Sequence, residues 1–226
     1  MEANATKGAQ VIAANVAAVR GKIAAACTAA GRDPATVRLI AVTKSQGPEV
    51  LAALAAAGIA DFGENRVEHL AEMLPHAPAG ARFHAIGRVQ GRQLAGVAAD
   101  CAVLHSLCAS DHVPRLARAC AARGRRLPVF IQVNAAGEAS KAGLAPAAVA
   151  AFLAAVRAEP ALDPVGLMTM APEGVAEGVI RAAFATLRDL AAGLGLARLS
   201  MGMSQDFPLA IAEGATDIRV GTRLFA

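Results

Sequence analysis

The stretch LIAVTKSQG, Leu39 to Gly47, begins as an unbroken apolar run and ends in a polar turn. A continuous run of aliphatic and β-branched residues is typical of a strand that is buried on both faces, as in a parallel sheet. Lys44 follows that run directly, and it is one of only four lysines in a chain that has eighteen arginines. The sequence therefore predicts a buried strand over 37–43 that brings an amine to the edge of a sheet.

Seven further short apolar runs follow along the chain. The eight expected strands are 37–43, 59–63, 82–87, 101–106, 128–133, 164–170, 197–203 and 216–221. The alanine-rich segments between them have helical spacing, with 92–98 the weakest, and are 48–57, 65–74, 92–98, 111–123, 146–158, 177–194 and 206–213. Strands that alternate with helices are typical of a parallel α/β sheet. Eight repeats favour a closed (β/α)8 TIM barrel over an open, doubly wound sheet.

The segment before the first strand is expected to be one helix over 4–30. Apolar residues recur there at helical spacing, and Gly31 is a stop signal. The chain ends directly after the eighth strand, so we expect this helix to take the place of a missing eighth outer helix. No break in composition marks a second domain. We expect a single domain over 1–226, with a helical segment 1–31 packed on a barrel of 37–225.

The composition argues against several classes of protein. Apolar residues make up 55% of the chain and charged residues 18%, which is typical of a globular protein. No apolar run reaches membrane-spanning length and no signal peptide is visible, so a cytoplasmic protein without a membrane partner is expected. The four cysteines lack metal-ligand spacing, so reduced thiols and no metal site are expected. The absence of Trp and Tyr argues against nucleic-acid binding despite the net charge of +4.

The active site of a (β/α)8 barrel lies at the carboxyl ends of its strands. Lys44 stands at such an end. Apolar side chains around a lysine lower its pKa, and the neutral amine can then attack a carbonyl to form a Schiff base. The alternative, about as well supported, is a lysine that extends into solvent or pairs with a carboxylate such as Glu64.

The two last strands are followed by residues that can bind phosphate. Loops at this position in barrels often do so through backbone N–H groups and a helix N-terminus. Ser204 is placed to cap a helix that begins near Asp206, and Gly221 and Thr222 offer backbone donors and a hydroxyl. Together with Lys44 they describe a ligand with an aldehyde at one end and a phosphate at the other. Pyridoxal 5′-phosphate (PLP) fits that description.

Six segments resemble, in order and spacing, the YggS family, also called the PROSC or PLP-homeostasis proteins. They are LIAVTKSQ, FGENRVEH, FHAIGRVQ, QVNAAGEASKAG, VGLMTMAP and LSMGMSQDFPLAIAEGATDIRVGTRLF. The resemblance covers about residues 37–225 and implies a barrel like the N-terminal domain of alanine racemase. It also implies a protein that holds PLP as a Schiff base, takes part in intracellular PLP homeostasis and supplies PLP to apo-enzymes.

The resemblance assigns the cofactor to particular residues. Lys44 would form the Schiff base, Asn65 and His84 would lie close to the cofactor, and Arg219 would face the pyridine nitrogen. The phosphate would be held after the last two strands. The full cofactor-binding set is Lys44, Asn65, His84, Met203, Ser204, Arg219, Gly221 and Thr222. Arg92 and Gln93 replace an asparagine and a lysine that are usual in the family, but these two lie outside the set.

Arg219 argues for modest chemistry. Its fixed positive charge disfavours protonation of the pyridine nitrogen, and an unprotonated ring is a weaker electron sink. Alanine racemase tolerates an arginine there but takes a second base, a tyrosine, from another domain, and this chain has no tyrosine. We therefore expect a PLP carrier with no catalytic residue. The alternative is a racemase-like PLP enzyme that acts on small amino acids.

The expected partners are PLP and apo PLP-dependent enzymes. A monomer is expected, because the second domain that forms the racemase dimer is absent. Lys141, in the segment NAAGEASKAG, has two interpretations. It is a loop lysine paired with Glu138 or, less favoured, a second amine that reacts with the aldehyde of PLP.

Overall fold

Eight parallel strands pair in chain order and close on themselves in the computed structural model, which describes residues 2–138, 142–172 and 174–226. The strands are β1 (Arg38–Val42), β2 (Asp61–Glu64), β3 (Arg82–Ala85), β4 (Val103–Leu107), β5 (Leu127–Gln132), β6 (Leu162–Met168), β7 (Arg198–Met203) and β8 (Asp217–Val220). The seam closes where β1 pairs with β8, with Ile40 opposite Arg219. This confirms the predicted TIM barrel and excludes the open sheet.

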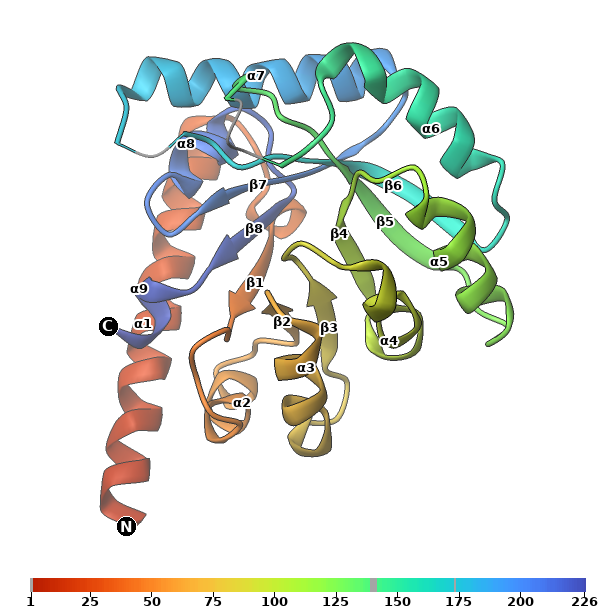
Figure 1. Ribbon diagram of the computed structural model, residues 1–226. Helices are drawn as coiled ribbons and strands as arrows, with labels where there is room; N and C mark the ends of the chain where they lie inside the picture. Colours follow the sequence, from red (N-terminus) through yellow and green to blue (C-terminus); the bar gives the residue numbers. More distant parts are fainter. Residues whose placement is uncertain (1, 139–141, 173) are drawn as a thin grey trace.

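Helices follow the strands on the outside of the barrel (Figure 1). They are α2 (Glu49–Ala56), α3 (Val67–Met73), α4 (Leu94–Asp100), α5 (His112–Ala121), α6 (Val149–Arg157), α7 (Glu177–Gly193), α8 (Phe207–Ala212) and α9 (Thr222–Phe225). Single 3-10 turns lie at Pro34–Thr36, Leu74–His76, Gly91–Gln93 and Pro146–Ala148. The end of α2 shows how the chain turns back, because Gly58 adopts a φ of 79° and lets Ile59 N–H donate to Leu54 O at 3.0 Å.

The N-terminal helix α1 (Glu2–Ala29) covers the seam between β8 and β1 and packs against α2, α8 and α9 (Figure 1). Its buried side chains recur every three or four residues and are Ile12, Val16, Val19, Ile23 and Cys27. Arg20 adds a polar link, since its guanidinium donates to Ala57 O at 3.0 Å and to Gly58 O at 2.7 Å. The helix therefore takes the expected place of an eighth outer helix.

The prediction that no segment reaches membrane-spanning length is wrong for α1. By length and composition alone, the helix over residues 8–29 is long and apolar enough to cross a membrane. Much of that hydropathy comes from exposed alanines, whereas the larger apolar side chains, except Val11, face the barrel. A helix that packs one stripe of side chains on a protein core meets the same criterion.

The interior of the barrel is filled only in part by apolar side chains. A small cluster of Val103, Phe130 and Met168 lies there, apart from the large core between the barrel and its helices. The remaining interior positions include buried polar side chains, among them His84, His105, Ser200 and Arg219. TIM barrels more often fill this space with branched aliphatic residues. The polar interior of this barrel therefore calls for a functional or electrostatic explanation.

The packing of α1 gives a matched test. Val16 is 1% exposed, whereas Val11 on the same helix is 44% exposed. We expect Val16→Ala to lower the free energy of unfolding by about 2 kcal/mol, because it removes two buried methyl groups and leaves a cavity. Val11→Ala should change it by less than about 0.5 kcal/mol. Urea denaturation of both variants measures this, and equal losses would contradict the packing of α1 on the barrel.

Candidate functional site

Lys44 lies in the turn directly after β1, and its side chain is exposed. The prediction that apolar side chains surround it is therefore wrong, and the solvent-exposed alternative is the observed one. The predicted pairing with Glu64 is also absent. Within the part of the chain that the structure describes, the Lys44 amine has no ion-pair partner. The other singled-out lysine, Lys141, lies outside the described residues, as does its predicted pairing with Glu138.

The backbone around Lys44 is fixed by the neighbouring β2–α3 unit. The Thr43 hydroxyl donates to the Glu64 carboxylate, which is 2% exposed. His69 Nδ1 lies 2.7 Å from the other oxygen of Glu64, and its Nε2 lies 3.1 Å from Gln46 O. Both flanks of Lys44 are thus tied to one buried carboxylate. The side chain is left free to move while its attachment point is held.

Asn65 lies at the next strand end, exposed in the bend after β2. Its backbone closely approaches Gly87, which follows β3. A Cβ atom added at Gly87 would lie 2.1 Å from Asn65 O, far inside van der Waals contact. The absence of a side chain at Gly87 therefore lets the ends of β2 and β3 come together beside Lys44.

The loops after β7 and β8 are joined at the predicted phosphate site. Gly221 N–H donates to Ser204 Oγ at 3.2 Å, and Arg223 Nε donates to Ser204 O. The prediction that Ser204 caps α8 is wrong: the helix begins at Phe207, and its N-cap, Asp206, makes no side-chain cap hydrogen bond. Asp206 Oδ1 instead accepts Met203 N–H at 2.5 Å. Ser204 Oγ accepts from Gly221 and, among the described residues, has no acceptor for its own proton, so it can donate to a ligand; Thr222 is exposed beside it.

Arg219 is a buried cation without a directly bonded carboxylate among the described residues. Its Nη1 donates to Ser200 Oγ at 2.6 Å and its Nη2 to Thr169 O at 3.0 Å, both neutral acceptors. Burial lowers the pKa of Arg219 to about 10, against the opposing charges of Asp206 and Asp217. The guanidinium stays charged at neutral pH and retains N–H groups that are not used by these two bonds. It is suited to one further electron-rich acceptor.

His84 lies inside the barrel, with its ring fully buried. Its Nε2 is 2.8 Å from Asp61 Oδ1 and its Nδ1 is 2.9 Å from His105 Nε2. Both ring nitrogens are thus occupied by protein groups. Its predicted place beside the cofactor stays a prediction, and any such contact would have to be made through ring carbons.

Some polar residues of the interior were not predicted as part of any site. They are Asp61, His105 and Ser200, together with His69 at the Lys44 turn. His105 and Ser200 each interrupt an apolar strand run, in CAVLHS and ARLSMGM, which is the one sequence signal that could have found them. The two residues are 95 positions apart in the chain, yet His105 Nδ1 lies 2.7 Å from Ser200 Oγ. Spacing along the sequence does not reveal such a pairing.

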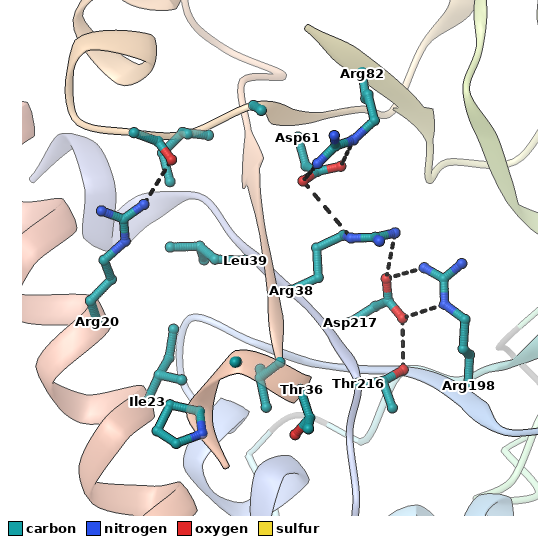
Figure 2. A pocket seen from close by; sticks show the side chains of 16 residues that line it. Arg20, Ile23, Thr36, Arg38, Leu39, Asp61, Arg82, Arg198, Thr216 and Asp217 are labelled. Atoms are coloured by element: carbon teal, nitrogen blue, oxygen red, sulfur yellow. Dashed lines mark hydrogen bonds and ion pairs between the residues drawn. The ribbon is translucent and has the colours of Figure 1, made fainter. Parts of the chain in front are cut away.

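A cavity of about 710 Å³ lies at the opposite end of the barrel, where the strands begin (Figure 2). Arg82 donates two hydrogen bonds of 2.8 and 2.6 Å to the Asp61 carboxylate. Arg198 donates two hydrogen bonds of 3.2 and 2.5 Å to the Asp217 carboxylate. Arg38 lies between the two carboxylates, 3.9 and 3.6 Å away. Charged residues at this end of a TIM barrel usually serve stability. We therefore place the candidate site at the other end, with Lys44.

The described residues contain no group of three His, Cys, Asp or Glu side chains that could hold a metal ion. The four cysteines are free thiols, and only Cys108 is partly exposed. Burial raises the pKa of Cys101 to about 12, so that thiol stays protonated. Among the described residues at the Lys44 end of the barrel, the candidate ligand-binding groups are the Lys44 amine, the Ser204 and Thr222 hydroxyls and the Arg219 guanidinium.

The sequence of this chain is similar to those of known proteins, and their family agrees with the barrel fold described above. Residues 14–226 match the family model described as alanine racemase, N-terminal domain. The pyridoxal phosphate homeostasis protein of Pseudomonas aeruginosa is 43% identical over 218 residues, which cover 95% of this chain and 94% of that protein. This chain belongs to the pyridoxal phosphate homeostasis family. The family member of Escherichia coli K12 is 36% identical over 230 residues, with 95% of each chain covered.

Solved structures support the same assignment. PipY of Synechococcus elongatus PCC7942, solved with PLP bound, is 34% identical, with a TM-score of 0.84 over 95% of this chain and 100% of that one. An alanine racemase of Clostridium difficile has a TM-score of 0.75 at 12% identity, over 93% of this chain and 56% of that one. The second likeness shows the barrel fold alone. The resemblance to the YggS family that the motifs indicated is confirmed.

The contact between Gly87 and Asn65 can be tested by a matched pair of glycine substitutions. We expect Gly87→Ala to cost about 1–3 kcal/mol of stability, because backbone must shift to admit the Cβ. Gly193→Ala, where a Cβ would meet nothing within 4 Å, should be neutral or slightly stabilising in its helix. Thermal and urea denaturation measure both. A neutral Gly87→Ala would show that the two strand ends are not held together as described.

The ion pairs of Asp61 predict a pH dependence of stability. Burial alone would raise the pKa of Asp61, but hydrogen bonds from His84 and Arg82 hold it well below its usual value of 3.8. A depressed carboxylate pKa stabilises the fold above the unfolded pKa, and this contribution is lost as pH falls below about 4. The stability gap between wild type and Asp61→Asn should thus be large at pH 7 and shrink toward pH 3. A gap that is constant with pH would contradict the pairing.

Proposed function

We propose that this chain binds PLP at the carboxyl end of the barrel and holds it as a Schiff base on Lys44. We propose further that it thereby takes part in intracellular PLP homeostasis and supplies the cofactor to apo-enzymes. One observation carries the proposal: the exposed amine of Lys44 and the Ser204 hydroxyl follow strands β1 and β7, the buried guanidinium of Arg219 belongs to β8, and these three strands are neighbours at the seam. PLP offers three matching groups, an aldehyde, a phosphate and a pyridine nitrogen.

The donor set fits the phosphate end. Ser204 retains a hydroxyl proton to donate, and Thr222 adds an exposed hydroxyl beside it. Arg223 is bound to Ser204 O, which places a positive charge behind the two hydroxyls. The Met203–Asp206 hydrogen bond stiffens the loop that carries Ser204. These residues would hold the phosphate and fix the orientation of the ring.

Arg219 fits the ring end. A pyridine nitrogen is a neutral acceptor, and the guanidinium has donors left over after Ser200 and Thr169. Because the guanidinium keeps its charge, it disfavours a proton on that nitrogen. PLP supplies an aldehyde for bond formation and a ring that can withdraw electrons, and Arg219 weakens the second property. The site is thereby suited to holding the cofactor more than to catalysis on amino acids.

The exposure of Lys44 fits a carrier. In the proposed step the neutral amine bonds to the aldehyde carbon and gives up both hydrogens, which leave with the aldehyde oxygen as water. Release is the reverse step and consumes one water. An amine at the solvent edge, on a turn fixed by Thr43, Glu64 and His69, allows both directions.

Borohydride trapping tests the role of Lys44. The protein is mixed with PLP, reduced and digested, and the modified peptide is identified by mass spectrometry. We expect the label on Lys44, and we expect Lys44→Ala to lose both the visible band of bound PLP and the label. Lys22→Ala, an exposed lysine on α1, is the matched control and should behave as wild type. A Lys44→Ala protein that keeps its band undiminished would overturn the assignment.

The proposed phosphate site predicts a loss of PLP affinity when Ser204 is replaced. Ser204→Ala removes one donor to a charged oxygen, so we expect PLP affinity to fall by about tenfold. The affinity for pyridoxal, which lacks the phosphate, should change little. Equilibrium titration of the visible band measures both ligands. Equal losses for PLP and pyridoxal would place the phosphate elsewhere.

A further inference from the structure

A chain of hydrogen bonds crosses the interior of the barrel from Arg219 to Asp61. Arg219 Nη1 lies 2.6 Å from Ser200 Oγ, and Ser200 Oγ lies 2.7 Å from His105 Nδ1. His105 Nε2 is 2.9 Å from His84 Nδ1, and His84 Nε2 is 2.8 Å from Asp61 Oδ1. The five groups come from β8, β7, β4, β3 and β2 in that order, and none is more than 6% exposed. This series of hydrogen bonds joins the candidate cofactor site to the ion pairs at the opposite end of the barrel.

The chemistry of its two ends fixes the direction of these hydrogen bonds. Arginine can only donate, so Ser200 Oγ must accept from Arg219. The serine can then give its own proton to His105 Nδ1, His105 gives the proton on Nε2 to His84 Nδ1, and His84 gives the proton on Nε2 to Asp61. The Asp61 carboxylate only accepts. In this order every donor has an acceptor, and both histidines carry their proton on Nε2.

The opposite order requires His84 to carry protons on both ring nitrogens. His105 would then hold its proton on Nδ1 and donate it to Ser200, which already accepts from Arg219. The Ser200 hydroxyl proton would have no acceptor among the described side chains, and a second cation would stand near Arg219. Burial and the positive charges around it lower the pKa of His105 well below the usual value, so His105 is neutral in either order. Hydrogen-bond satisfaction favours the first order.

We propose that Ser200 and His105 are positioning residues for Arg219. Ser200 at Nη1 and Thr169 O at Nη2 fix the plane of the guanidinium. His105 holds Ser200 in the rotamer that accepts, and His84 anchors His105 on Asp61. The plane in turn sets which N–H is presented to the cofactor ring. This last step rests on the proposed function, whereas the order of the hydrogen bonds does not.

The donor–acceptor order of the hydrogen bonds between Arg219 and Asp61 can be tested in the protein without PLP. Two-bond ¹H–¹⁵N correlation spectra of the histidine-labelled protein at pH 7.5 report the tautomer of each ring, and single His→Gln variants assign the signals. We expect His84 and His105 both protonated on Nε2 alone. A proton on Nδ1 of His105 would overturn the proposal, because Ser200 could then not donate its hydroxyl proton to that nitrogen.

The positioning role is tested with PLP. We expect Ser200→Ala to remain trapped at Lys44 by borohydride but to bind PLP about ten- to a hundredfold more weakly, with a shifted visible band, because the charged Arg219 loses one of its two acceptors. Thr186→Ala is the control: its hydroxyl donates to Ala182 O at 2.8 Å within α7, outside this series of hydrogen bonds and away from the candidate site. It should show the wild-type band and affinity.

The outcomes separate the two proposals. A wild-type protein that is not trapped at Lys44 overturns the proposed function, and the tautomers still decide the order of the hydrogen bonds. If the wild type is trapped at Lys44 but Ser200→Ala has the same band and affinity as Thr186→Ala, the positioning role alone is overturned. If Ser200→Ala does not fold, Ser200→Cys, which keeps a weaker donor and acceptor, takes its place with an intermediate band shift expected.

Discussion

The positive charge of Arg219 inside the barrel is the constraint on which the rest of this structure depends. A buried guanidinium is costly unless its N–H groups find acceptors, and the acceptors of Arg219 among the described residues are the hydroxyl of Ser200 and the carbonyl of Thr169. The hydroxyl is itself held by a histidine pair that ends on Asp61. The polar filling of the barrel follows from this need. So does the demand for one more acceptor at the mouth, where a pyridine nitrogen fits.

The two ends of the barrel divide stability from binding. Where the strands begin, arginines and aspartates satisfy one another across β1, β2, β3, β7 and β8 (Figure 2). Where the strands end, hydrogen bonds fix the polar groups in place, but some of their donors have no acceptor among the described residues. Glu64 fixes the turn around Lys44 without pairing with its amine, and Ser204 accepts from Gly221 while keeping its own proton. A site with fixed but unused donors is suited to a ligand that must be held and given up again.

The repeat of apolar runs was enough to predict the barrel, because each strand must be buried on both faces and so reads as continuous hydrophobic sequence. Element ends were less predictable: β2 begins at Asp61, two residues later than expected, and β6 begins at Leu162, ahead of Pro164. Ser204 showed the limit of local patterns, since a serine before a helix resembles a cap, whereas its partner lies in the next loop. The pairing of His105 with Ser200 depends on barrel closure, which no short segment encodes.

A crystal structure of the protein soaked with PLP tests directly the proposal that Lys44, Ser204 and Arg219 hold the cofactor. We expect continuous density from Lys44 Nζ to the aldehyde carbon, the phosphate on Ser204 and Thr222, and a guanidinium N–H of Arg219 within hydrogen-bond distance of the ring nitrogen. PLP bound through another lysine, or seated in the arginine-lined cavity where the strands begin, would contradict it.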